Sequence, residues 1–86
     1  MILQGYSMLP TLTNGSLLWV QAQDNYQVGD IIVFHYLDKG FVVHRIINIR
    51  ESIIVCKGDN SNRREVILLR QVLGKVVSYL LSDDSC

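Results

Sequence analysis

The clearest strand pattern in the chain is Ile31-Ile32-Val33-Phe34-His35-Tyr36, followed by Leu37-Asp38-Lys39-Gly40 and Phe41-Val42-Val43-His44-Arg45-Ile46-Ile47-Asn48-Ile49. β-branched and aromatic residues dominate the first and third segments, as is typical of strands. The segment between them has the chemistry of a hairpin turn. The sequence therefore predicts an antiparallel hairpin over residues 31–49, with His44 inside the returning strand.

Short apolar segments continue on both sides of this hairpin, with turn residues between them. Before it, residues 16–21 predict a strand whose Trp19 we expect in the core, and after it, residues 53–57, 66–69 and 73–81 predict further strands. Apart from one helical turn over residues 69–73, no segment keeps a 3.6-residue period. The pattern favours a mainly β fold, either a small coiled antiparallel sheet or a partly open β-barrel.

Composition sets the size and the class of the protein. The chain has 86 residues, of which 49% are hydrophobic and 19% charged, and this indicates a single packed domain over residues 1–86. The formal net charge of +0 provides no field to attract a polyanion, so we expect no nucleic-acid partner.

The sequence shows neither a membrane span nor a secretion signal. No apolar run approaches the roughly 18 residues that a membrane-spanning helix needs. The residues before Ser7 contain no basic region and no long apolar segment. We therefore expect a cytoplasmic location, or membrane association through a missing anchor or a membrane-anchored partner.

The two cysteines, Cys56 and Cys86, have neither the spacing of a disulfide framework nor that of a metal site. Cys56 falls in a predicted strand, where we expect a buried thiol, and Cys86 is a tail residue. The sequence thus predicts no metal and no cofactor.

Ser7 stands in a turn that can present its hydroxyl group outward. Gly5 can adopt dihedral angles that are closed to other residues, and Pro10 fixes its own φ and restricts Leu9. An isolated Gly-x-Ser is more often an ordinary turn. A nucleophilic serine also needs a base within hydrogen-bond reach, so its partners decide between these interpretations.

The candidate bases are few. The chain has two histidines, His35 and His44, and a desolvated lysine is the alternative, with Lys39, Lys57 and Lys75 as candidates. His44 is favoured because a strand fixes its position among apolar neighbours, whereas His35 lies near the end of the hairpin.

Several motifs in order resemble those of the type I signal peptidases and of the LexA-type self-cleaving repressors that share their fold. They are Gly5-Tyr6-Ser7-Met8-Leu9-Pro10, Gly29-Asp30-Ile31-Ile32-Val33-Phe34, Val43-His44-Arg45-Ile46, Lys57-Gly58-Asp59-Asn60 and Gly74-Lys75-Val76-Val77. Many relatives carry a lysine base where this chain has His44. The endoplasmic-reticulum, archaeal and some Gram-positive signal peptidases carry histidine followed by arginine there, so the chain resembles this histidine branch.

The resemblance implies a serine endopeptidase that cleaves leader or signal peptides. Ser7 would be the nucleophile and His44 the general base, with Asp59 as the acid of the Gly-Asp-Asn motif. Relatives usually carry a second acid in an Asp-Asp pair, where this chain has Arg64-Glu65, so Glu65 is the other candidate. Which acid orients His44 stays open, and Asp59 is equally compatible with a simple turn role.

The resemblance also implies an oxyanion and substrate-binding region around the serine, formed by Gly5, Tyr6, Met8 and Pro10. Backbone N–H groups would hold the oxyanion, because Gly5 stands where some relatives provide a hydroxyl group. Met8 and Pro10 would support the turn. The substrate would bind as an extended strand with small side chains beside the scissile bond.

Two other functions are compatible with the sequence. A catalytically weak or inactive peptide-binding module would keep the fold and bind extended peptides without cutting them. A repressor-like self-cleaving domain is disfavoured, because we find no DNA-binding segment, no Ala-Gly or Cys-Gly cleavage site and no lysine at the position of His44.

Overall fold

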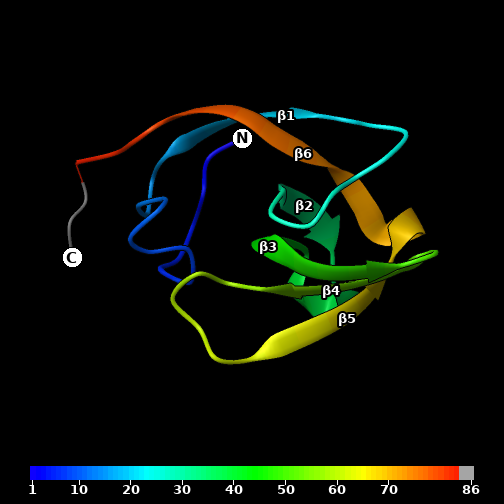
Figure 1. Ribbon diagram of the computed structural model, residues 1–86. Coiled ribbons are helices and arrows are strands. Elements are labelled where there is room, and N and C mark those ends of the chain that lie inside the picture. The colour runs from blue at the N-terminus through cyan, green and yellow to red at the C-terminus, as the bar shows by residue number, and fades with distance from the viewer. Residues whose placement is uncertain (84–86) are drawn as a thin grey trace.

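A computed structural model describes residues 1–83 and shows a mainly β protein (Figure 1). In this part of the chain the elements are β1 (Leu17–Gln21), β2 (Ile31–His35), η1 (Leu37–Lys39), β3 (Phe41–Arg50), β4 (Ile53–Lys57), β5 (Arg64–Leu68), η2 (Leu69–Gln71) and β6 (Val72–Leu80). The two η elements are single 3₁₀ turns. Cys86, for which we predicted a tail position, lies outside the described residues.

All the strands belong to one six-stranded antiparallel sheet with the order β1-β6-β2-β3-β4-β5. The sheet is strongly coiled, and β6 crosses from β1 to β2 (Figure 1). Because β1 and β5 end the order, the sheet does not close. The prediction of a mainly β, coiled antiparallel fold is confirmed.

The hairpin formed by β2 and β3 is the centre of this sheet. Its register runs from Ile31 opposite Arg45 to His35 opposite Phe41. The turn contains η1 and ends at Gly40, whose φ of +75° favours glycine. On its other side β3 pairs with β4 only from Arg45 onward, so residues 41–44 have a strand partner on one side alone among the described pairings.

The core consists of two clusters on opposite faces of β2, because successive side chains of a strand alternate between its faces. One cluster contains Leu3, Met8, Leu12, Leu18, Val33 and Val43. The other contains Ile32, Phe34, Ile46, Ile54, Cys56 and Ile67. Burial of Cys56 is confirmed, and the first cluster ties the segment that carries Ser7 to the sheet.

The prediction that Trp19 belongs to the core is wrong. Leu18 faces inward and is 2% exposed, so its neighbour Trp19 must point to the other side of β1 and is 50% exposed. The burial of Trp19 is therefore determined by its position in the strand and not by the size of its indole ring.

The C-terminal half begins its strands slightly earlier than the sequence suggested. We expected a strand from residue 66, but β5 starts at Arg64 and includes Glu65. The expected helical turn is η2, and β6 follows at Val72.

Within residues 1–83, no helix is both long and apolar enough to cross a bilayer.

Candidate active site

The segment 5–12 forms a compact turn that holds Ser7 at the surface of the sheet. Gly5 has a φ of +106° and donates its N–H to Asn14 Oδ1 at 2.7 Å. Met8 and Leu12 are fully buried, and burial of each such side chain contributes about 1.5–3 kcal/mol. Ser7 itself stays half-buried. The turn is thus anchored by its apolar residues and leaves the hydroxyl group accessible.

Two of the predicted supports differ in their burial. Met8 is fully enclosed, and its sulfur accepts the Asp59 N–H at 3.5 Å, as expected for a residue that fixes the turn. Pro10 is exposed and so has little packing role. Tyr6 is 43% exposed, and its carbonyl oxygen accepts the side-chain amide of Asn60 at 3.1 Å.

His44 lies in β3 with its ring directed at the serine. Its Nε2 is 3.3 Å from Ser7 Oγ, and the residue is 8% exposed. Ile32 is its cross-strand partner, and the ring of Phe34 packs against it edge-on at 6.0 Å. An apolar wall and a strand backbone therefore fix the imidazole in place.

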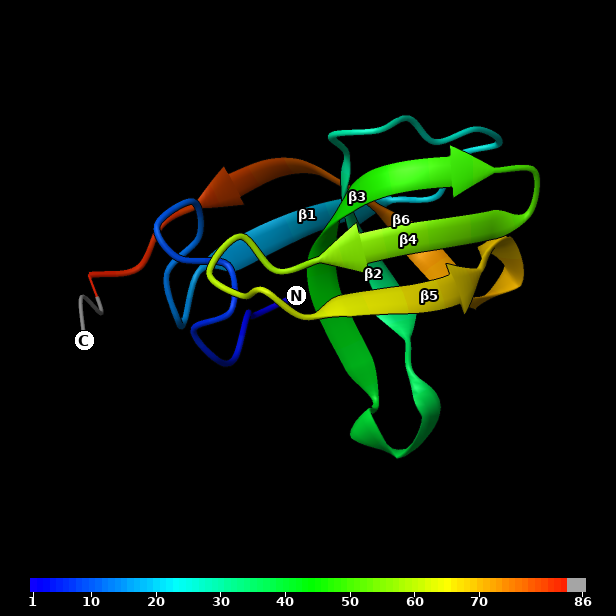
Figure 2. The same cartoon turned by 60° about the horizontal axis from the view of Figure 1, so that its bottom comes forward.

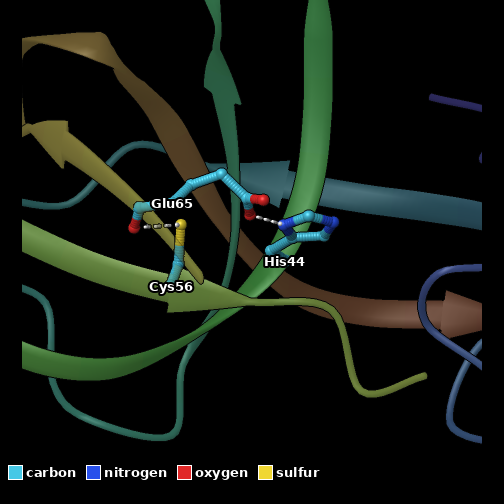
Figure 3. A group of neighbouring side chains, drawn as sticks. All are labelled: His44, Cys56 and Glu65. Carbon is cyan, nitrogen blue, oxygen red and sulfur yellow. Dashed lines mark hydrogen bonds and ion pairs between the residues drawn. The ribbon is translucent and has the colours of Figure 1, made fainter. Parts of the chain in front are cut away.

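Glu65 contacts the other nitrogen of the same ring. Its Oε1 is 2.6 Å from His44 Nδ1, and the residue is 9% exposed (Figure 3). An ionised carboxylate accepts hydrogen bonds only, so the proton of the neutral ring lies on Nδ1. That tautomer leaves a lone pair on Nε2 that faces the serine hydroxyl group.

Asp59, the other candidate for the acid of the site, makes its side-chain hydrogen bonds to Arg45 and Thr11. Its carboxylate accepts hydrogen bonds from Arg45 Nε and Nη2, both at 2.9 Å, and from Thr11 Oγ1 at 2.5 Å. The hydrogen bonds from Arg45, and then that from Thr11, hold the pKa of Asp59 below its usual value against the effect of burial. The same contact raises the pKa of Arg45. Of the two acids, the structure brings Glu65 to His44 and joins Asp59 to Arg45 and the serine segment.

The loop between β4 and β5 clamps the serine segment (Figure 2). The backbone N–H of Asn60 donates to the Ser7 carbonyl oxygen at 2.7 Å. A Cβ atom on Gly58 would lie 2.6 Å from that oxygen, 3.0 Å from Ser7 Cβ and 3.1 Å from His44 Nε2. Only glycine fits there, so Gly58 sets how closely the hydroxyl group and the imidazole approach each other.

Sequence reasoning gave no role to Gly58 or Asn60, although both stand in a quoted motif. The position of Gly58, directly after a predicted strand and beside polar loop residues, could have indicated its role. A glycine at such a place often marks close approach of another backbone.

A pocket of about 330 Å³ opens next to the serine. Its lining consists of Met1, Ile2, Leu3, Gln4, Ser7, Phe41, Val42 and Val43. The part of β3 in this lining is the part that has no second strand partner. None of Gly5, Tyr6, Met8 and Pro10 is among the lining residues, so an extended ligand would meet residues 1–4 and 41–43 instead.

The candidate site also contains one set of potential metal ligands. His44, Cys56 and Glu65 each offer a donor atom, and these atoms lie within 4.8 Å of one another. Cys56 Sγ is 3.8 Å from the Glu65 carbonyl oxygen, to which it donates a weak hydrogen bond.

A comparison with protein families defines the class. The sequence matches the Peptidase S24-like family over residues 1–77, and the chain belongs to that family. The matched region includes the serine segment, His44, Asp59 and Glu65. This confirms the coarser part of the resemblance, a peptidase of the LexA and signal peptidase type.

The other two comparisons add no relative. No curated protein and no solved structure matched the chain.

Proposed function

We propose that this protein is a serine endopeptidase of the signal peptidase-like, histidine type, which cleaves leader or signal peptides. The observation that carries the proposal is the hydrogen-bonded series from Glu65 through His44 to Ser7, with distances of 2.6 and 3.3 Å. A base that is held by a carboxylate and aimed at a hydroxyl group is the arrangement that activates a serine. Membership of the Peptidase S24-like family supports the same reaction class.

The proposed reaction is acyl transfer. His44 Nε2 takes the Ser7 proton while Oγ attacks a peptide carbonyl carbon, and the protonated ring then gives that proton to the departing amine. Water hydrolyses the acyl-enzyme by the same route in reverse. Glu65 keeps the ring in the reactive tautomer and stabilises the imidazolium ion. Backbone N–H groups around Ser7 are the proposed oxyanion donors.

Asp59 receives a different role in this proposal. Its carboxylate accepts hydrogen bonds from Arg45 and Thr11, so it acts as a positioning residue. Through the loop that contains Asn60, it holds the backbone of the serine segment in place.

The proposed substrate is an extended peptide that pairs with the free side of residues 41–44. The adjoining pocket is lined mainly by apolar residues, so apolar or small side chains fit it better than charged ones.

The proposal includes a cytoplasmic location, or attachment to a membrane through another segment or a membrane-anchored partner.

One observation favours the alternative of a peptide-binding module with little activity. The distance of 3.3 Å between His44 Nε2 and Ser7 Oγ is long for a hydrogen bond from a hydroxyl group. Catalytic hydrogen bonds often tighten only when substrate binds, so this distance is also compatible with an enzyme.

Labelling with a serine-directed acylating inhibitor separates the two functions. We expect a single adduct on Ser7, located by mass spectrometry after digestion. Ser7→Ala should abolish it, while Ser78→Ala, at an exposed serine of β6, should label like the wild type. A folded wild-type protein that acquires no adduct would support the binding module.

A further inference from the structure

Three strands contribute one side chain each to a buried cluster behind the proposed catalytic serine. Cys56 of β4 stands directly opposite Glu65 of β5 and also pairs with Ile46 of β3. His44 is two residues from Ile46 and therefore lies on the same face of the sheet. The register of the sheet thus gathers an imidazole, a thiol and a carboxylate (Figure 3).

The donor set is that of a zinc-type site. Nitrogen, sulfur and carboxylate oxygen are the usual ligands of Zn²⁺, at bond lengths of about 2.0–2.3 Å. Tetrahedral ligands at those lengths are about 3.2–3.8 Å apart. The three donor atoms already lie within 4.8 Å of one another, and His44 Nδ1 and Glu65 Oε1 are 2.6 Å apart. A cation therefore requires adjustments of about 1 Å, mostly along flexible side-chain torsions.

The surroundings favour retention of a bound ion. The exposed fractions are 8% for His44, 0% for Cys56 and 9% for Glu65, so little water competes for the ligands. The hydrogen bond that Cys56 Sγ gives up is the weak one of 3.8 Å to a carbonyl oxygen.

We propose that a thiophilic divalent cation such as Zn²⁺ binds His44 Nδ1, Cys56 Sγ and the Glu65 carboxylate, and that this binding switches off the proposed protease. The binding site stands on the geometry alone, whereas the inhibitory effect rests on the proposed function. The remaining position of the tetrahedron is left for water or for the second carboxylate oxygen.

Inhibition follows from the chemistry of the imidazole ring. A neutral ring has one N–H and one lone pair. At rest the proton is on Nδ1 and the lone pair on Nε2 faces Ser7. When a cation takes the lone pair of Nδ1, the ring proton moves to Nε2, and the thiol releases its own proton to solvent. His44 then has no free pair with which to accept the Ser7 proton.

The thiol of Cys56 also determines which cations can bind at this site. Cys56 is fully buried, so a cation that binds its sulfur must displace the thiol proton. Zn²⁺ and Cd²⁺ bind thiolate strongly enough to do this, whereas Mg²⁺ and Ca²⁺ prefer oxygen ligands. We therefore expect inhibition by the first pair and none by the second at equal concentration.

The first test measures binding without any need for activity. A Ser7→Ala protein is titrated with Cd²⁺, and the ultraviolet charge-transfer band of a cadmium–thiolate bond is recorded. We expect one ion per chain, with affinity reduced at least tenfold by Cys56→Ser and by Cys56→Ala. Cys86→Ser and His35→Ala remove the other thiol and the other imidazole, and should leave the affinity unchanged. Equal affinity in the Cys56 variants, or binding lost with Cys86 or His35, overturns the site.

The second test follows the switch itself in the wild-type protein. Zn²⁺ should slow acylation of Ser7 at least tenfold, and a chelator should restore the rate. In nitrogen-15 spectra, the protonated nitrogen of His44 should change from Nδ1 to Nε2. Zn²⁺ that binds without slowing acylation overturns the switch. Cadmium binding in a protein whose Ser7 is never acylated refutes the proposed function and leaves the site standing, so the two failures are distinguishable.

Discussion

His44 and Arg45 are neighbours in β3, yet they serve two different regions of the molecule. His44 faces Ile32 and the second core cluster, and its carboxylate partner is Glu65. Arg45 faces the other side of the strand, and its partner is Asp59. The first pair is about 10% exposed at both side chains, whereas the second is 33% and 17% exposed. The buried pair is thus suited to proton transfer and the more solvated pair to positioning.

The comparison predicts a hierarchy of effects. Changes on the His44 side should act mainly on chemistry, and changes on the Arg45 side mainly on the stability of the serine segment. Both sides meet at Gly58 and Asn60, which touch Ser7 directly. A substitution can therefore remove a member of one of the two pairs, or alter the place where both pairs meet the serine segment.

The largest effect is expected from His44→Gln. Loss of the base should lower the rate of Ser7 acylation by roughly 10⁴-fold or more, because the hydroxyl group then keeps its proton. The measurement is the time course of labelling by a serine-directed inhibitor. His35→Gln, at an exposed histidine of β2, is the matched control and should acylate at the wild-type rate. Similar rates in both variants would remove His44 from the mechanism.

Glu65→Gln should lower the same rate by roughly 10²- to 10⁴-fold. The amide lacks the charge that stabilises an imidazolium ion, and it can donate to Nδ1 and so place the ring proton on Nε2. Circular dichroism should show an intact fold. A rate within threefold of the wild type would contradict the assignment of Glu65 as the orienting acid.

Gly58→Ala tests the junction between the two sides. Its methyl group would approach the Ser7 carbonyl oxygen to 2.6 Å, so Ser7 and His44 must move apart, and acylation should fall by roughly 10²-fold. Gly74→Ala is a matched control, because its methyl group would lie 2.8 Å from the Gln21 backbone, away from the serine. We expect Gly74→Ala to lower thermal stability while its folded fraction acylates normally. Comparable losses of acylation in both variants would show a purely structural effect.

The smallest effect on chemistry is expected from Asp59→Asn. The amide keeps some hydrogen bonds but loses the charge, so acylation should fall about tenfold or less, with a loss of about 1 kcal/mol in the free energy of unfolding at neutral pH. The lowered pKa of Asp59 fixes the sign of the pH dependence. Its stabilising effect is present above the unfolded pKa of about 3.9 and is lost as the pH falls through the folded value.

Denaturant unfolding of both proteins between neutral and acidic pH checks this last expectation. The difference between wild type and Asp59→Asn should shrink towards zero in acid. A larger loss of acylation from Asp59→Asn than from Glu65→Gln would reverse the roles of the two acids.

Much of the fold was accessible from the sequence, because a period of two is a local property. The hairpin over residues 31–49 and the other strands were predicted within a few residues of their observed positions. The prediction that Trp19 lies in the core was wrong because the size of its side chain was given more weight than the inward-facing position of Leu18. The start of β5 was missed because Arg64 and Glu65 are polar, although Glu65 pairs directly with Cys56.

The candidate site was only partly accessible. The motif around Ser7 and the position of His44 named two groups that the structure brings together. The choice between Asp59 and Glu65 stayed open, and apart from Ser7 the residues that line the pocket were not identified. That choice depends on a register across β3, β4 and β5, and the pocket depends on where the N-terminal segment meets β3. Neither is encoded by neighbouring residues.

The class of fold could be inferred from the chain alone, because alternating apolar residues and turn motifs act over a few positions. Ser7 and His44 were candidates because their motifs resemble those of the signal peptidases. Three contacts became visible only in the folded protein: Glu65 bonds to the imidazole, Asp59 bonds to the serine segment, and Cys56 lies in the buried cluster. These contacts join side chains that are 9 to 48 positions apart in the chain, and such side chains come together only when the register of the strands and the loop contacts are set.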